Sequence, residues 1–331
     1  MKLQVNNYNL PTNDHLWLDQ TSPSDYVYDP MCNGCGFIMT PYSLIKNINN
    51  DVGLVTGLCT ECGFTKRLRN LSNDAFTKHF SKRWLTCRQE KLLPFYHVYN
   101  ETSDCLPKNS SVLDIGCGIG SYLLPYHLNG HDVHGVEPSE HRWGTANEHL
   151  PNIFNGNAEQ YLLNCKQKFD LIYIHDVLQF VEDPFRLLDL SAHCLKENGY
   201  IWFKIGVYFK RSNFCQFSHF GVLRNYVNLY CLKNFVSNNS LRLIKYKNMP
   251  IEVLLQKSNL SSNFPIKSKK TNLNDIGKFV KKTIGYNSLK LLGKSKVSYL
   301  NRNINLSLIE KESVLPVEFI YDKNTLPILL K

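Results

Sequence analysis

The sequence predicts an α/β protein with a mainly parallel sheet, preceded by a small metal-binding module. Two observations carry this prediction. Short apolar runs alternate with helical segments from residue 111 onward, and the first run ends in a turn that holds three glycines. Upstream of these runs, four cysteines form two Cys-x-x-Cys pairs.

The composition indicates a folded chain of more than one part. With 331 residues the chain exceeds a typical single domain, and 43% hydrophobic residues suffice for a core. No apolar run approaches the roughly 20 residues needed to cross a bilayer, and the N-terminus lacks the apolar core of a signal peptide. Eleven cysteines without such a signal favour a reducing compartment, so we expect a cytoplasmic protein with no transmembrane segment.

The net charge of +10 is concentrated toward the C-terminal end. Residues 259–331 hold 13 Lys and Arg and 5 Asp and Glu, a local charge of +8, which leaves +2 for the rest of the chain. A catalytic domain that gripped nucleic acid should itself be basic. This distribution therefore speaks against nucleic acid as the main partner.

The cysteine pairs are Cys32-x-x-Cys35 and Cys59-x-x-Cys62, and each is followed at once by glycine. Two such pairs at this separation predict a closed, tetrahedral Zn²⁺ site with four cysteine ligands. Four protein ligands leave no open position, so the metal is expected to be structural. A redox pair or four unrelated buried thiols are the alternatives.

Residues 73–100 predict a helix, because aromatic and leucine side chains recur on one side at helical spacing. Pro94 is expected to kink or split this helix.

Residues 112–120 read V-L-D-I-G-C-G-I-G, a buried strand that runs into a glycine turn ahead of a short helical segment. Such a unit brings backbone N–H groups close to a ligand. The dinucleotide fingerprint Gly-x-Gly-x-x-Gly fails on spacing, and no Gly-Lys-Ser/Thr follows for a phosphate-binding loop. Asp114 would repel a pyrophosphate and suits a ligand with a positive centre.

The pattern D-x-G-x-G-x-G after an apolar strand resembles motif I of the class I S-adenosylmethionine (SAM) methyltransferases. Later segments match the same family in order: a second strand ending in an acid (132–138), G-N-A-E (156–159), a fourth strand with its loop (169–184) and a fifth strand (195–205). The resemblance covers roughly residues 111–245. It implies a Rossmann-like class I methyltransferase sheet of seven strands, the last one antiparallel.

The resemblance also implies which residues hold SAM. Asp114 would orient the cofactor, Glu137 would hold the ribose hydroxyls, and Asn157 stands where the family usually has an Asp at the adenine. The full set implied to contact SAM is Asp114, Gly116, Cys117, Gly118, Gly120, Glu137, Asn157, Ala158, His175 and Asp176.

A zinc-knuckle segment ahead of a SAM domain is similar to bacterial methyltransferases that modify nucleotide-linked sugars and related small metabolites. A ribosomal RNA guanine methyltransferase family also begins with a zinc knuckle. Its cysteine pairs are closer together and its fourth ligand is commonly His, so the match is poorer.

Beyond the fifth strand, residues 204–230 are expected to shape the ligand crevice. His219 lies in F-x-x-x-x-H-F, which looks like a family segment whose His is a candidate general base; a hydrogen-bonded structural His is the alternative.

Three segments compete as the final antiparallel strand: residues 251–256, 304–309 and 317–321. Family members often place an amphipathic helix before that strand, and residues 274–293 fit such a helix, so we expect the strand at 304–309. The helix is basic and could also make peripheral contact with an anionic membrane, although docking on its own domain is the commoner outcome.

Together these observations predict an enzyme that transfers a methyl group from SAM to O or C of a small-molecule acceptor, with a nucleotide-linked sugar as the favoured example. The alternatives are a zinc-knuckle RNA methyltransferase and a non-catalytic SAM-fold scaffold. The expected organisation is a zinc module over 1–72, a helical cover over 73–110, the methyltransferase domain over 111–310 and a C-terminal extension over 311–331.

Overall fold

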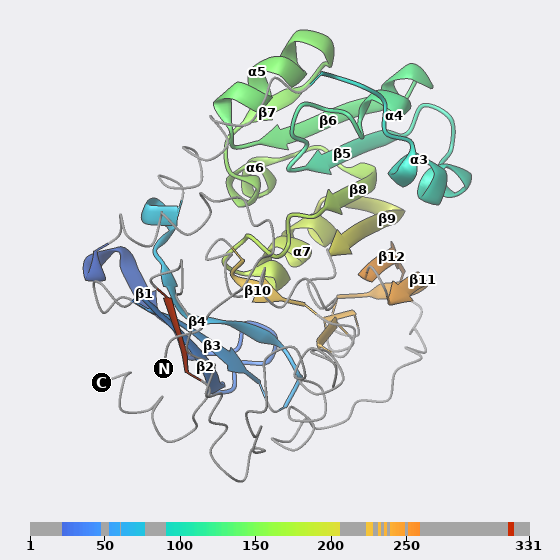
Figure 1. The fold of residues 1–331 in the computed structure, drawn as a ribbon. Helices are drawn as coiled ribbons and strands as arrows, with labels where there is room; N and C mark the ends of the chain where they lie inside the picture. The colour runs from blue at the N-terminus through green and yellow to red at the C-terminus, as the bar shows by residue number, and fades with distance from the viewer. Residues whose placement is uncertain are drawn as a thin grey trace, which may run out of the picture. The chain divides into compact units, whose positions relative to one another are not determined.

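The structure is a computed structural model that describes residues 22–47, 53–59, 61–76, 91–205, 223–227, 231–232, 235–236, 239–248, 251–258 and 317–320. The chain divides into two compact units (Figure 1). Unit 1 comprises Met1–His79, Val207–Cys231 and Ser268–Lys331, and unit 2 comprises Phe80–Gly206 and Leu232–Lys267. None of the helices in the described part of the chain has the length and apolarity that crossing a membrane demands.

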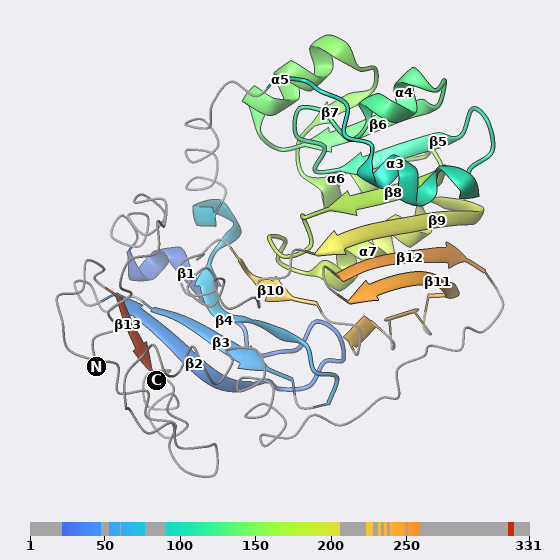
Figure 2. The same cartoon turned by 45° about the vertical axis from the view of Figure 1, so that its right-hand side comes forward.

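Unit 2 is built on a seven-stranded sheet in the order β11-β12-β9-β8-β5-β6-β7, and Figure 2 shows these strands one below another. The strands are β5 (Ser111–Ile115), β6 (Asp132–Glu137), β7 (Ile153–Asn155), β8 (Phe169–His175), β9 (Leu195–Ile205), β11 (Leu241–Asn248) and β12 (Ile251–Lys257). Strands β5 to β9 pair in parallel, whereas β12 runs antiparallel to both of its neighbours. The prediction of a seven-stranded sheet with one antiparallel strand is therefore confirmed.

Short helices in the described part of unit 2 accompany this sheet: α3 (His97–Thr102), α4 (Leu124–Leu128), α5 (Glu140–His149), α6 (Ala158–Asn164) and α7 (Pro184–His193). The start of α7 shows how local sequence sets a helix boundary. Asp183 accepts hydrogen bonds from the backbone N–H groups of Phe185 and Arg186, both at 3.0 Å, and Pro184 occupies the first helical position.

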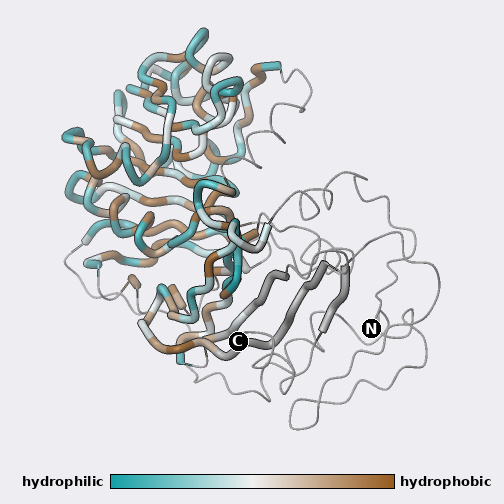
Figure 3. Tube along the Cα trace, turned by 90° about the vertical axis from the view of Figure 1, so that its left-hand side faces the viewer, coloured by the Kyte–Doolittle hydropathy of each residue, from teal (hydrophilic) through white to brown (hydrophobic). Residues whose placement is uncertain are grey.

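The central strands are buried on both faces, as parallel strands covered by helices require. All five residues of β5 are buried, and Figure 3 shows hydrophobic and hydrophilic residues alternating along the tube of unit 2. The core cluster joins Val112, Leu171, Tyr173, Trp202 and Leu254 from four neighbouring strands. This core fixes the strand ends that carry the candidate site.

The expected position of the last strand is wrong. The antiparallel strand beside β9 is β12, which pairs Glu252 with Lys204 and Leu254 with Trp202. It follows β11 after a two-residue connection, so the two form a hairpin with little loop entropy to overcome. Residues 274–293 and 304–309 lie outside the described residues, and Val317–Ile320 forms β13 in the other unit.

The helix expected over 73–100 is interrupted. Residues 73–76 are helical and 91–96 are not, and α3 begins only at His97. Pro94 accounts for the break, because it cannot donate a backbone hydrogen bond and disfavours helical geometry in the residue before it. Residues 77–90 lie outside the described residues.

Unit 1 contains a second sheet, with strand order β1-β4-β3-β2-β13 and with β10 also paired to β4. Its strands are β1 (Tyr26–Tyr28), β2 (Thr40–Asn47), β3 (Gly53–Leu58), β4 (Thr65–Leu71), β10 (Asn225–Tyr226) and β13 (Val317–Ile320). Three distant parts of the chain therefore supply one sheet. In particular, β10 comes from the segment between β9 and β11 of unit 2.

Candidate active site and metal centre

The glycine turn after β5 is fastened to the neighbouring strand. The backbone N–H groups of Gly116 and Cys117 donate to the carbonyl oxygen of Val136 at 2.8 and 3.1 Å. Gly116, Gly118 and Gly120 have φ of 77°, 56° and 89°. These left-handed values favour glycine over any residue with a side chain, so the three glycines serve the shape of the turn.

Two of these glycines have very different surroundings. A Cβ built on Gly120 would lie 2.3 Å from Leu150, so this glycine is needed for packing. A Cβ on Gly118 would find its nearest neighbour, Arg142, 4.0 Å away. Gly118 therefore presents bare backbone to open space, which is the surface that a ligand can approach.

Glu137 ends β6 beside this turn. Its carboxylate accepts hydrogen bonds from the backbone N–H groups of Gly118 and Ser139, both at 2.8 Å. The side chain is buried. A carboxylate oxygen can accept from more than one donor, so this group is suited to bind ligand hydroxyl groups.

Asp114, two residues before the first glycine of the turn, is a deeply buried acid of unit 2. It is 1% exposed, and its Oδ1 atom has no hydrogen-bond partner among the described residues. Burial raises the pKa of its carboxyl well above the usual range. Because an unpaired buried carboxylate is costly, the arrangement fits a ligand that brings a positive charge or a donor.

Asn157 and Ala158 lie at the start of α6. The Asn157 side chain accepts a hydrogen bond from the backbone N–H of Glu159 at 2.8 Å and caps the helix. Its role as an adenine contact stays a prediction.

His175 ends β8 and lies in a stack of rings. Its imidazole stacks on Tyr122, with centroids 4.3 Å apart, and on Trp202 at 5.9 Å. Burial lowers the pKa of His175 to about 4, so the ring is neutral near neutral pH. Its Nε2 lies 3.2 Å from the ammonium of Lys204, and its Nδ1 lies 3.5 Å from the carboxylate of Asp176.

Asp176 and the turn after it pack against the glycine turn. A Cβ on Gly116 would lie 2.4 Å from Val177, the residue after Asp176. Asp176 itself has a left-handed φ of 57°, and its Oδ1 is buried without a hydrogen-bond partner in the described part of the chain. The structure thus brings His175 and Asp176 next to the predicted SAM residues.

SAM fits this set of residues. Its sulfonium and amino groups are positive and match the Oδ1 atoms of Asp114 and Asp176, which lack hydrogen-bond partners among the described residues. Its ribose hydroxyls match the acceptor oxygens of Glu137, and the bare backbone at Gly118 permits a close approach.

The candidate metal centre lies in unit 1. The Sγ atoms of Cys32, Cys35, Cys59 and Cys62 all lie within 4.8 Å of one another. A tetrahedral zinc site needs sulfur atoms about 3.8 Å apart, from a Zn–S distance of about 2.3 Å. The four thiols are therefore close to the arrangement that Zn²⁺ requires.

The two knuckles have the same backbone geometry. Gly36 donates to the carbonyl of Cys32 at 2.8 Å, and Gly63 donates to that of Cys59 at 2.9 Å. Both glycines have φ of 75°. The repeat of one turn explains why each Cys-x-x-Cys pair ends in glycine.

The thiols of the cluster lie in contact: Sγ of Cys32 is 3.5 Å from Sγ of Cys62, and Sγ of Cys35 is 3.3 Å from Sγ of Cys59. The hydrogen bond with Cys59, together with burial, raises the pKa of Cys32 to about 12. Such a cluster can hold four thiolates only with a compensating positive charge. This requirement agrees with a Zn²⁺ centre.

Some residues near the candidate site were not predicted from the sequence, and one predicted residue is not described by the structure. His219 lies outside the described residues. Lys204 and Tyr122 were not singled out. Lys204 could have been noticed as a lone cation near the end of the apolar run I-W-F-K-I, but its alignment with His175 depends on strand register.

Comparison with known proteins supports the SAM interpretation. The family described as "Methyltransferase domain" matches residues 87–213. The ubiquinone biosynthesis O-methyltransferase of Aromatoleum aromaticum is 25% identical over 139 residues, which cover 39% of this chain and 58% of that protein. The protein of the same name from Pelagibacter ubique is 32% identical over 102 residues, covering 30% and 42%. This chain thus spans about half the length of the curated relatives it matches.

Solved structures of methyltransferases are also similar. Magnesium protoporphyrin IX methyltransferase from Synechocystis is 16% identical, covers 56% of this chain and 96% of its own, and has a TM-score of 0.42. The family match spans the glycine turn and strands β5 to β9 of unit 2. On this evidence, residues 87–213 match a methyltransferase domain, and this part of the chain is similar to known O-methyltransferases.

Proposed function

We propose that this protein transfers the methyl group of SAM to an oxygen or carbon atom of a small-molecule acceptor. The observation that carries the proposal is the buried carboxyl of Asp114, whose Oδ1 atom has no hydrogen-bond partner among the described residues, just before a glycine turn whose Gly118 faces open space. The names of the curated relatives support a small-molecule acceptor and methylation at oxygen.

When bound, SAM supplies a methyl group that the sulfonium already activates. The protein's own residues then mainly bind and orient, which is where such catalysis gains most. Asp114 and Asp176 would hold the positive groups, and Glu137 would hold the ribose hydroxyls. Asn157 and Ala158 would border the adenine, and His175 would lie near the transferred methyl group. His219 remains the candidate base from the sequence.

We also propose that Cys32, Cys35, Cys59 and Cys62 bind one structural Zn²⁺. The close approach of their Sγ atoms supports this. The metal would replace the core that so small a module cannot build by itself.

Two kinds of molecule are candidates for the acceptor of the methyl group. The sequence resemblance favours a nucleotide-linked sugar. The zinc module and the local charge of +8 over residues 259–331 favour RNA as the second candidate. RNA binding through such a tail would weaken steeply as salt increases.

The test is methyl transfer from labelled SAM to separated polar-metabolite, lipid and RNA fractions. Asp114→Asn is the test variant, and Asp189→Asn, on the exposed side of α7, is the matched control. Label in polar metabolites that is lost only in Asp114→Asn supports the proposal. Label in RNA or in lipid overturns the small polar acceptor, and no label together with no SAM binding leaves a scaffold.

A further inference from the structure

The carboxyl edge of the unit 2 sheet carries one row of polar residues across four strands. Strand register pairs His175 with Lys204, Lys204 with Glu252, and Glu252 with Lys247. Directly paired residues point to the same face of a sheet. One face therefore carries a neutral imidazole, a cation, an anion and a second cation in sequence.

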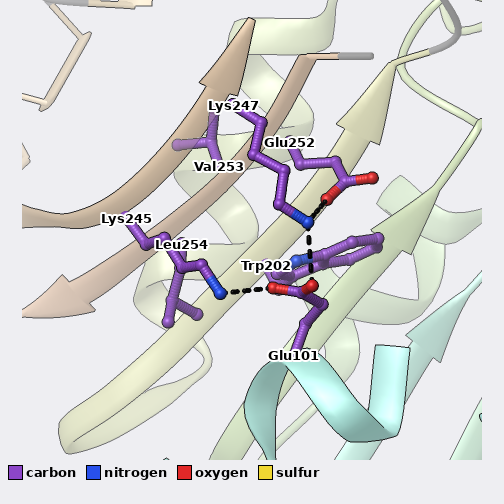
Figure 4. A pocket seen from close by; sticks show the side chains of 7 residues that line it. All are labelled: Glu101, Trp202, Lys245, Lys247, Glu252, Val253 and Leu254. Carbon is purple, nitrogen blue, oxygen red and sulfur yellow. Dashed lines mark hydrogen bonds and ion pairs between the residues drawn. The ribbon is translucent and has the colours of Figure 1, made fainter. Parts of the chain in front are cut away.

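The outer part of this row is already neutralised. The two oxygens of Glu252 lie 3.1 Å from Nε2 of His97 and 2.8 Å from Nζ of Lys247. Lys247 also donates to Glu101 at 2.8 Å, and Lys245 donates to the same carboxylate at 2.5 Å (Figure 4). These contacts join α3 to β11 and β12 and pair the charges of Glu101 and Glu252 with those of Lys245 and Lys247.

Lys204 differs from these neighbours. Among the described residues its ammonium contacts Nε2 of His175 at 3.2 Å, and its only carboxylate there is that of Asp176 at 3.6 Å, longer than a hydrogen bond. A lysine ammonium has three N–H donors. The Lys204 side chain is 21% exposed and that of Asp176 is 37% exposed, so a ligand can reach the cation.

Lys204 also lies beside the glycine turn. The imidazole that accepts its hydrogen bond stacks on Tyr122 of the segment just after that turn. Asp176, its ion-pair partner, precedes the residue that contacts Gly116. The cation thus lies next to the residues that are proposed above to hold SAM.

We propose that Lys204 is a catalytic residue that binds the acceptor's reacting oxygen in its ionised form, and that the acceptor is therefore a phenol- or enol-type hydroxyl. This inference rests on the proposed function. His175 is a positioning residue, because its neutral ring accepts from Lys204 and fixes the direction of the ammonium.

The chemistry balances without a protein base. The acceptor hydroxyl releases its proton to water, and Lys204 keeps its own protons. The ionised oxygen forms the O–C bond with the methyl carbon as the C–S bond breaks, and the electron pair of that bond stays on sulfur, which becomes neutral.

The strength of one ammonium limits the acceptor. An opposite charge within contact distance lowers the pKa of an acid by about 1–3. At neutral pH the ionised fraction of a phenol with a pKa of about 10 then rises about 10- to 1000-fold, whereas an unactivated alcohol stays protonated. Because the pKa of His175 is about 4, its ring is a poor base for removing an alcohol proton. An ordinary sugar hydroxyl does not meet this condition, so this inference favours a phenol- or enol-type acceptor over the nucleotide-linked sugar that the sequence resemblance suggests.

The experiment uses the full chain saturated with S-adenosylhomocysteine, the product of the transfer, and 4-nitrophenol as the probe. The nitrophenolate absorbs visible light and nitrophenol does not, so a spectrum reports ionisation of the bound probe. We compare wild type with Lys204→Met, Lys204→Arg and the control Lys196→Met. Lys196 lies on the same strand and pairs with Asp170 at 2.7 Å.

Wild type should bind the probe and lower its apparent pKa by about 1. Lys204→Met should abolish this shift and weaken phenolate binding roughly tenfold. Lys204→Arg should keep part of the pKa shift, and Lys196→Met should match wild type in both measurements. A bound probe with an unshifted pKa, or no probe binding to the loaded wild type, overturns the proposal. Calorimetry of SAM binding separates the two proposals: unchanged SAM affinity in Lys204→Met leaves the proposed function intact, whereas a wild type that does not bind SAM removes both.

Discussion

The carboxylate of Glu137 accepts a hydrogen bond from the backbone N–H of Gly118 at 2.8 Å. This contact joins the acid that ends β6 to the glycine that faces open space. Asp114 lies buried below the same turn with an unpaired oxygen. The predictions for SAM binding follow from this arrangement of two acids and one bare stretch of backbone.

Replacing Asp114 by Asn should weaken SAM binding and stabilise the ligand-free protein. The buried carboxylate matches a positive ligand, so its loss should raise the Kd for SAM roughly tenfold or more. The folded pKa of Asp114 lies above the unfolded value, so this group binds more protons when folded, and its contribution to stability falls as pH rises through that interval.

Asp114→Asn should therefore raise the melting temperature at about pH 7 and change it little at about pH 4, where the carboxyl keeps its proton. Thermal unfolding at both pH values and calorimetric titration with SAM check this. The prediction is contradicted if wild type and Asp114→Asn have the same melting temperature at both pH values, or if the two proteins bind SAM with the same affinity.

Alanine at Gly118 and at Gly120 should separate binding from folding. Both positions have positive φ, which costs alanine about 1–2 kcal/mol. Gly118→Ala adds a methyl group to open space, so the protein should fold but bind SAM poorly. Gly120→Ala places a Cβ 2.3 Å from Leu150 and should lose considerably more stability. Melting temperatures and SAM titrations of the pair decide the matter, and the reverse order would refute the assignment of the open face.

The purified protein should contain about one zinc ion per chain. Cys59→Ser should lose most of it, because one of four thiolate ligands is gone. Cys165→Ser, outside the cluster, should retain it. Metal analysis measures the content, and hydrogen exchange should show faster exchange in β3 and β4 after chelation. A metal-free protein with unchanged exchange would argue for four plain thiols.

Arg224 should anchor β10 to β4. It is 5% exposed, its guanidinium donates to Asn73 at 2.5 Å and to the carbonyl of Leu71 at 3.0 Å, and it lies 4.2 Å from the Phe76 ring. Arg224→Ala should cost roughly 2–3 kcal/mol of local stability. Hydrogen exchange over residues 223–227 should then accelerate.

The control for this experiment is Arg69→Ala. Arg69 also lies in β4, and its guanidinium is 5.6 Å from the Tyr26 ring. Its loss should leave residues 223–227 protected, and equal acceleration in both variants would speak against an anchor at Arg224.

Local pattern predicted most of the candidate site. The glycine turn, the acid at the end of β6 and the two cysteine knuckles are each formed by residues close together in sequence, so spacing alone identifies them. The family order of segments then predicted the sheet. The cap at Asn157 was not predicted, although Asn directly before a helix is typical of one.

What escaped prediction depends on register between distant segments. Lys204 meets His175 only because β8 and β9 pair in one alignment. The addition of β10 to β4 joins residues about 160 positions apart. The position of the last strand was predicted wrongly because family members often place a helix before that strand, and residues 274–293 fit such a helix. The actual strand, β12, directly follows β11 in sequence and pairs with it as a hairpin.

Glu101 should stabilise unit 2 at neutral pH and lose that effect in acid. Hydrogen bonds from Lys245 and then Lys247 lower the pKa of its carboxyl to about 2. A folded pKa below the unfolded value of about 4.3 gives stability that is present above the unfolded pKa and is lost as pH falls through the folded one.

Glu101→Gln should therefore cost roughly 1–2 kcal/mol at about pH 6, after allowance for solvent screening at the half-exposed lysines. The difference from wild type should shrink below about pH 4.3 and be small near pH 2. Urea unfolding across this range measures it, with exposed Glu148→Gln as the control. A cost that stays constant with pH would mean that the Glu101 side chain stabilises α3 by packing, and that its charge contributes little.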